Sequence, residues 1–187
     1  MEFVVAGAFV LIIVVLVLVA IGMYNRLVQL RNLAEQAWAD VDVQLTRRHD
    51  LIGNLVETVK GYASHERETL EKVIQARAAA TSAQGPAQQA QAEGFLTQAL
   101  RGLLAVAEAY PELKADANFR ELQRELTATE DRIAQSRQVY NATVREYDTA
   151  RETFPTNIIA GMFNFEPREY YEVDDPESRA PVEVSFD

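Results

Sequence analysis

The chain has 187 residues, of which 48% are hydrophobic and 25% charged, so it is not an intrinsically disordered protein. It contains no cysteine, which excludes disulfides, thiolate zinc sites, iron–sulfur clusters and cysteine nucleophiles. Its formal net charge of −10 has the wrong sign for binding nucleic acid phosphates, and its two histidines leave little room for a histidine-rich metal site.

The first feature along the chain is an apolar segment, residues 3–23, that contains no charged residue. At 1.5 Å per residue such a helix is about 31 Å long, which matches the hydrocarbon core of a bilayer. A cleaved signal peptide is the rival interpretation. The missing basic N-terminal region, the length of the apolar run and the absence of an A-x-A-like site before Tyr24 all favour a retained transmembrane anchor, residues 1–25.

The orientation of the anchor is predicted from the two arginines that flank it, Arg26 and Arg31, both on its C-terminal side. The positive-inside rule then places the remainder of the chain in the cytoplasm. We therefore expect a single-pass protein of the inner (cytoplasmic) membrane, with the lipid bilayer as its first partner.

Residues 26–162 are predicted to form a soluble helical bundle. The helical part opens with apolar or long side chains spaced by three and four, typical of one buried helix face: Leu27, Leu30, Ala34, Ala37, Val41, Gln44, Arg48, Ile52, Leu55, Val59 and Tyr62. This helix is expected to continue directly from the anchor and to break near Gly61. Ser64 is the candidate cap of a second helix.

Two more helices follow the turn at residues 82–86. The third is expected to stop at Pro111, and the fourth to begin at Asn118 with a capping box and to end at Pro155. The predicted fold class is therefore all-α, an up-down four-helix bundle of long rod-like helices. An alternative merges the first two soluble helices into one coiled-coil-like rod.

Residues 163–187 form a third region that is predicted to be extended. It begins with aromatic residues and continues as an acidic, proline-bearing tail. Phe163, Phe165, Tyr170 and Tyr171 are many aromatics for an exposed segment. They are candidate interaction residues, which either pack back on the bundle or form a docking strip.

The densest polar cluster of the bundle contains Asp40, Asp42, Arg47, Arg48, His49 and Asp50. One interpretation is a polar layer that recognises a partner or fixes helix register, and the other is a salt-bridged helix surface. Arg47, Arg48, His49 and Asp50 are the remaining candidate interaction residues. Charge reversal at both arginines is expected to abolish self-association if they mediate it.

The sequence offers no catalytic set. The Glu-x-x-His pairs of di-iron bundles are absent because residue 46, three before His49, and residue 62, three before His65, are not glutamate. No phosphate-binding loop and no G-x-S-x-G serine motif is present. We therefore predict no enzyme, no cofactor and no metal site.

Several long stretches of the sequence are distinctive, of which residues 24–32 (YNRLVQLRN), 54–63 (NLVETVKGYA) and 105–114 (AVAEAYPELK) are examples. The others are residues 37–52, 65–66, 118–119, 140–141 and 154–157. On these stretches the chain closely resembles the LemA family of bacterial membrane-anchored proteins. The resemblance implies one N-terminal span, a cytoplasm-facing helical bundle and no established enzymatic activity. One branch of the family is associated with magnetosome membrane formation, which suggests membrane organisation.

Two positions depart from the family pattern. Gly53 stands where the family usually has proline, and Asn164 stands where glycine is common. Glycine at position 53 keeps a flexible point but not the broken hydrogen bond that proline imposes on a helix.

Two functions are compatible with these features. The first is a non-enzymatic, membrane-anchored scaffold that self-associates as a homo-oligomer and organises the membrane or its proteins. The alternative is an adaptor or regulator of a membrane protease, transporter or signalling complex, with that membrane protein as its partner.

Overall fold

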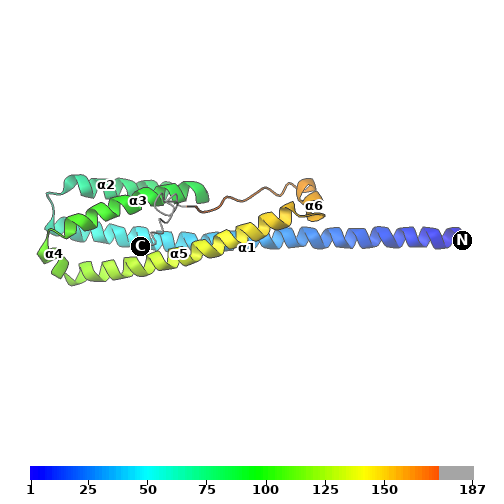
Figure 1. Ribbon diagram of the computed structural model, residues 1–187, viewed down its shortest axis with the longest axis horizontal. Helices are drawn as coiled ribbons and strands as arrows, with labels where there is room; N and C mark the ends of the chain where they lie inside the picture. The colour runs from blue at the N-terminus through cyan, green and yellow to red at the C-terminus, as the bar shows by residue number, and fades with distance from the viewer. Residues whose placement is uncertain (173–187) are drawn as a thin grey trace, which may run out of the picture. The chain divides into compact units, whose positions relative to one another are not determined.

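The computed structural model describes residues 1–172, and the regular secondary structure of this part of the chain is all helical, with no strand. The elements are α1 (Glu2–Tyr62), α2 (Arg67–Ser82), α3 (Gly85–Ala107), α4 (Pro111–Ala115), α5 (Ala117–Glu152) and α6 (Thr156–Met162) (Figure 1). The predicted all-α class is therefore confirmed. The acidic part of the predicted tail, from residue 173 onward, lies outside the described residues.

Helix α1 runs without interruption from the apolar segment to Tyr62. It is the one helix in the described part of the chain that is long and apolar enough to cross a membrane. The large apolar side chains of residues 3–21 are 45–94% exposed, whereas Leu27 is fully buried. The character of the helix surface thus changes within a few residues after Met23.

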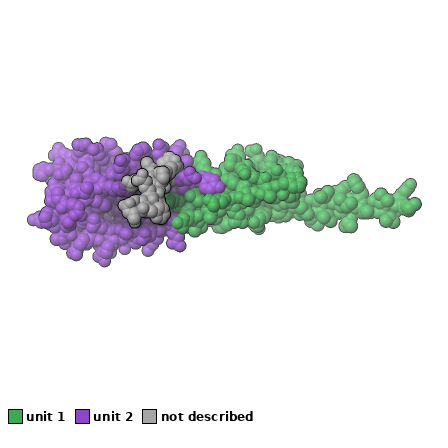
Figure 2. Space-filling view, viewed as in Figure 1, with its two compact units in different colours: residues 1–40, 136–169 green, residues 41–135, 170–187 purple. Residues whose placement is uncertain are grey.

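The described residues form two compact units (Figure 2). Unit 1 comprises residues 1–40 and 136–169, and unit 2 comprises residues 41–135 with residues 170–172. The helices α1 and α5 each contribute to both units, because each is long enough to extend beyond one core.

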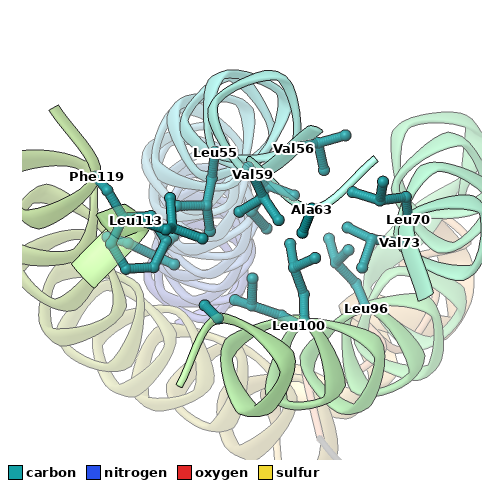
Figure 3. Packing of buried hydrophobic residues seen from close by; sticks show 14 of the residues in the cluster. Leu55, Val56, Val59, Ala63, Leu70, Val73, Leu96, Leu100, Leu113 and Phe119 are labelled. Carbon is teal, nitrogen blue, oxygen red and sulfur yellow. The ribbon is translucent and has the colours of Figure 1, made fainter. Parts of the chain in front are cut away.

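The core of unit 2 is built from four helices and the short α4. Leu55, Val56 and Val59 of α1 face Leu70 and Val73 of α2 and Leu96 and Leu100 of α3 (Figure 3). Leu113 of α4 and Phe119 of α5 close the cluster on the other side. The predicted apolar stripe of the first soluble helix is confirmed along most of its length, but Tyr62 at its end is 41% exposed.

The predicted break after Gly61 is confirmed, because α1 ends at Tyr62 and α2 begins at Arg67. The alternative that merges these two helices into one rod is wrong. The predicted cap Ser64 is also wrong, since Glu66 holds the N-cap position. Ala63, in the turn between these helices, is buried against the core, and α2 begins only after Glu66.

Two other helix boundaries differ from the predictions. Pro111 does not end α3, which stops at Ala107, but begins α4, where its missing N–H costs nothing. Helix α5 begins before Asn118, and the side chain of Asp116 provides the cap: its Oδ1 accepts a 2.8 Å hydrogen bond from the backbone N–H of Phe119. This bond lowers the pKa of Asp116.

Unit 1 contains the short helix α6, which the sequence patterns did not predict. Its Ala160 packs with Leu27 and Leu30 of α1 and Tyr147 of α5. Asn164 adopts a positive φ of 55°, and the backbone N–H of Phe165 donates a 2.9 Å bond back to the carbonyl of Ala160. This is the left-handed helix ending that usually takes glycine and that asparagine tolerates, so the departure at Asn164 preserves the backbone shape.

The segment after α6 is held by two tyrosines that lie seven residues apart on one face of α5. The hydroxyl of Tyr140 donates a 2.7 Å hydrogen bond to the carbonyl of Glu169, and that of Tyr147 a 2.8 Å bond to the carbonyl of Glu166. Burial raises the pKa of Tyr140 to about 12, so this hydroxyl keeps its proton, and its donor role, throughout the physiological range.

The carbonyl of His49 is the group in α1 that a proline at position 53, the usual residue in the family, would affect. A proline at position 53 would remove the helical N–H that bonds this carbonyl, four residues earlier. The side chain of Arg77 already donates to it, with Nε 2.6 Å from the carbonyl oxygen. An added Cβ at Gly53 would lie 3.3 Å from Arg77 Cζ, at the flexible end of that side chain.

We therefore predict coupling between positions 53 and 77. In a Gly53→Pro background, Arg77 must satisfy the His49 carbonyl alone, so Arg77→Ala should cost about 1 kcal/mol more than in the natural background. Denaturant unfolding of the full chain in detergent, for the two single variants and the double variant, measures the difference. Additive costs would show that Arg77 does not replace the missing helical donor.

Candidate functional site

The densest buried polar cluster of the described residues joins α1 to α3 within unit 2. Arg48 and His49 follow one another on α1, and Glu93 lies on α3. All three are buried, with exposures of 3%, 7% and 3%. Nη1 of Arg48 donates to Oε2 of Glu93, and Nε2 of His49 lies 2.6 Å from Oε1 of the same carboxylate.

Three further polar side chains surround this buried trio. Gln89, one turn before Glu93 on α3, donates from Nε2 to Oε1 of Glu93 at 2.9 Å and to the carbonyl of Ala80 on α2 at 3.0 Å. Thr97 Oγ1 accepts a 2.8 Å bond from Nη2 of Arg48. Nε of Arg48 lies 2.7 Å from Oε1 of Glu130 on α5, an ion pair that lacks hydrogen-bond alignment.

The buried ionic network, defined as Arg48, His49, Gln89, Glu93, Thr97 and Glu130, therefore connects four helices. Arg48 alone reaches α3 and α5, and Gln89 connects α3 to α2. A guanidinium has five donors in a fixed plane, which suits it to bind two carboxylates from different helices.

The electrostatics of the network depend on Glu93. Burial on its own raises the pKa of this carboxyl, but the hydrogen bond from His49, the charge of Arg48 and the hydrogen bond from Gln89 outweigh it, so that the pKa is lowered. Glu93 is therefore a carboxylate at neutral pH. Its negative charge compensates the buried guanidinium, which stays charged because an arginine side chain does not lose its proton in a protein.

The geometry of the network favours a structural role over a chemical one. Both oxygens of Glu93 are engaged by donors from the protein itself. In residues 1–172, no group of three His, Asp or Glu side chains is arranged to hold a metal ion. A surface groove of unit 2, between α3 and α5, is lined by Leu104, Arg120, Gln123, Arg124, Leu126, Thr127, Ala128 and Asp131. None of the network residues lines this groove.

The other members of the predicted polar cluster lie at the surface. Nη2 of Arg47 pairs with Oε2 of Glu125 on α5 at 2.6 Å, and both side chains are nearly half exposed. Asp50 is 73% exposed and lies 3.8 Å from Nη2 of Arg77. The predicted cluster is thus divided: Arg48 and His49 point into unit 2, whereas Arg47 and Asp50 remain accessible to a partner.

The aromatic residues predicted after α6 also have different surroundings. Phe165 is 8% exposed and packs in the core of unit 1, with the guanidinium of Arg31 5.6 Å from its ring centroid. Tyr171 is 2% exposed and Tyr170 is half-buried. Phe163 is 57% exposed, and its ring packs edge-on against Tyr24, with centroids 4.9 Å apart.

The sequence patterns did not identify Gln89, Glu93 or Glu130 as members of the site. A signal was present, because Gln89 and Glu93 continue the buried stripe of α3, which includes Leu96, Leu100 and Leu103. Glu93 is an acid on this buried stripe, and Arg48 is an arginine on the buried stripe of α1. Their opposite charges are the signal that could have identified them as a pair.

The amino-acid sequence of this chain is similar to those of several known proteins. A model described as the LemA family matches residues 37–186. Magnetosome protein MamQ 2 of Paramagnetospirillum magneticum is 25% identical over 185 residues, covering 85% of this chain and 68% of the relative. MamQ of Magnetospirillum gryphiswaldense is equally similar. Protein LemA of Metamycoplasma hominis is 26% identical over 153 residues, covering 81% of this chain and 70% of the relative.

The two carboxylates that pair with Arg48 allow a matched test of the network. Glu93→Gln leaves a buried guanidinium without its buried partner and should lower the free energy of unfolding by about 3 kcal/mol. Glu130→Gln removes a carboxylate whose side chain is 43% exposed, and it should cost less than about 1 kcal/mol. Denaturant unfolding of the full chain in detergent distinguishes the two. Equal costs would contradict the assignment of Glu93 as the central anion.

The natural chain and the Glu93→Gln variant also test the pKa of Glu93. Because the folded-state pKa of Glu93 is below its ordinary value of 4.5, its stabilising contribution is complete above about pH 4.5 and is lost as the pH falls through the folded-state value. The stability difference between the natural chain and Glu93→Gln should therefore shrink below that pH. A difference that stays constant in acid would contradict this linkage.

Proposed function

The chain belongs to the LemA family, and from that premise we propose that it is a non-enzymatic, membrane-anchored helical scaffold that self-associates and organises membrane or membrane proteins. Its relatives include proteins named as magnetosome proteins, MamQ 2 and MamQ. The name of none of these relatives states a catalytic activity.

The observation that carries the proposal is the continuity of α1. One helix begins in the exposed apolar segment and ends in the core of unit 2. Exposed aliphatic side chains over such a length are stable only in a lipid environment. The helix that anchors the chain therefore also supplies Ile52, Leu55 and Val59 to a folded core, which is what a scaffold held at a membrane requires.

The buried ionic network supports the non-enzymatic part of the proposal. Catalytic acids and bases need a free lone pair or proton directed at a substrate. Here the carboxylate of Glu93 is engaged by Arg48, His49 and Gln89, each from within the protein. These bonds join helices and leave no oxygen of that carboxylate available to a substrate.

The proposed location is the inner membrane, with the helical units in the cytoplasm. Arg26 and Arg31 follow the apolar segment within eight residues, and the side chain of Arg26 is 63% exposed although it pairs with Glu146. Basic residues next to a span favour the cytoplasmic side.

Self-association is proposed from the anchor and from the accessible pair at Arg47. Anchors inserted in parallel confine the chains to one plane, which raises their effective concentration so that weak lateral contacts become significant. The Arg47–Glu125 ion pair is partly exposed, so an acidic side chain of a second copy could compete for the guanidinium.

Charge reversal at Arg47 tests the lateral contact without disturbing the buried network. Arg47→Glu should raise the concentration at which the oligomer dissociates by about tenfold, or about 1.4 kcal/mol. The matched control is Lys60→Glu, because Lys60 is also an exposed base on α1 paired with one acid, Glu57. Mass photometry of the full chain in polymer nanodiscs measures both.

Three outcomes of this experiment would argue against the proposal. If the natural chain is a monomer in nanodiscs, self-association is not its function. If both variants weaken the oligomer equally, the contact is a general charge effect rather than a site at Arg47. If a different membrane protein copurifies at fixed stoichiometry, the adaptor function replaces the scaffold.

A further inference from the structure

An uncharged segment links the end of α5 to the segment held by the tyrosines. Residues 153–165 contain no acidic or basic side chain. Four apolar residues in this segment lie at the surface, and we call them the juxtamembrane patch: Phe154, Ile158, Met162 and Phe163. Their exposures are 75%, 53%, 72% and 57%. Large apolar side chains grouped in this way usually mark a surface that meets lipid or protein.

The local structure holds this patch outward. Ile158 and Met162 lie four residues apart on α6 and so share one helix face. The opposite face carries Ile159 and Ala160, which pack against the core of unit 1. Helix α6 is therefore fixed by one face and presents the other, so the exposure of the patch is a consequence of packing.

The position of the patch within unit 1 indicates what covers it. The ring of Phe163 packs against Tyr24, and that of Phe165 lies 5.6 Å from Tyr24 between centroids. Tyr24 comes directly after Met23, the last residue of the uncharged apolar segment. In Figure 1, α6 lies beside α1 at the place where the helix continues alone toward the N-terminus. The patch is thus continuous with the apolar surface of the span.

We propose that the juxtamembrane patch inserts into the boundary between headgroups and acyl chains, in the leaflet through which α1 leaves the bilayer. This inference rests on the proposed function, because it requires that residues 3–23 span the membrane. Tyrosine rings at the end of a span lie at headgroup depth. The ring contact with Tyr24 brings Phe163 to the same depth.

The charges next to the patch explain why apolar area, rather than charge, would drive the insertion. On one side Arg151 pairs with Asp148 at 3.2 Å and with Glu152 at 2.7 Å. On the other side Arg168 pairs with Glu35. Because these two arginines are paired with acids, the charges on either side of the patch add little attraction to anionic lipid, and its insertion should depend mainly on apolar area.

The test uses the natural absence of cysteine. Single cysteines at Met162, Leu18 and Val43 are labelled with an environment-sensitive fluorophore in the full chain, which is reconstituted into phosphatidylcholine vesicles. Leu18 lies within the span. Val43 is the matched control, an apolar residue of α1 that is 61% exposed and twenty positions beyond Met23, which is about 30 Å along the helix.

The label at position 162 should be quenched by lipids that carry a shallow nitroxide, on the order of twofold more strongly than the label at position 43. The label at position 18 should be quenched best by deep nitroxides. A second labelled position, 158, should behave like position 162. Circular dichroism of each labelled chain checks that the helices are retained.

Each other outcome is decisive. If position 18 is quenched but position 162 behaves like position 43, the inserted patch is wrong and the span stands. If position 18 is not quenched, the span and this inference both fail. If position 162 is shielded from an aqueous quencher but not quenched by lipid, a protein covers the patch, and the lipid assignment is wrong.

Discussion

The structure depends on a single uninterrupted helix, α1, which carries two different surfaces in succession. Its first part presents aliphatic side chains on every face, the surface expected of a helix that meets lipid. From Leu27 onward the same helix buries one stripe and exposes charged residues on the rest. The transition occupies the few residues around Tyr24, and Phe163, which directly follows α6, packs at this position. The backbone hydrogen bonds of α1 continue through it, so the anchor and the folded core share one element.

The buried ionic network places a second constraint on the fold. Burying a guanidinium costs several kcal/mol of desolvation, which an apolar residue would avoid. The partners of Arg48 are correspondingly specific, because Glu93, Thr97 and Glu130 meet it from two different helices. A shift of α3 by one turn would leave the guanidinium and the carboxylate unpaired. We interpret the network as a device that fixes the register of α1 against α3, which an all-leucine core would specify less well.

The sequence predicted what depends on local periodicity and missed what depends on distant partners. The stripe from Leu27 to Val59 and the helical class follow from spacing, and the break follows from the glycine at position 61. The caps at Ser64 and Asn118 were wrong because several polar residues near a helix start compete, and tertiary packing selects among them. Arg48 lies on the predicted stripe, but its partner Glu93 is more than forty residues away, and no local pattern connects that carboxylate to Arg48 or to His49. Helix α6 was missed because seven residues are too few for a periodic signal.

The continuity of α1 is the central claim, and hydrogen–deuterium exchange of the full chain in lipid nanodiscs tests it most directly. If one helix joins the span to the core of unit 2, the amides from Tyr24 to Asp40 should be protected at least about 100-fold over an unstructured peptide. Protection should then continue without a gap into residues 41–62. Rapid exchange confined to part of residues 24–40, between two protected regions, would show that the helix is broken there and would contradict the account.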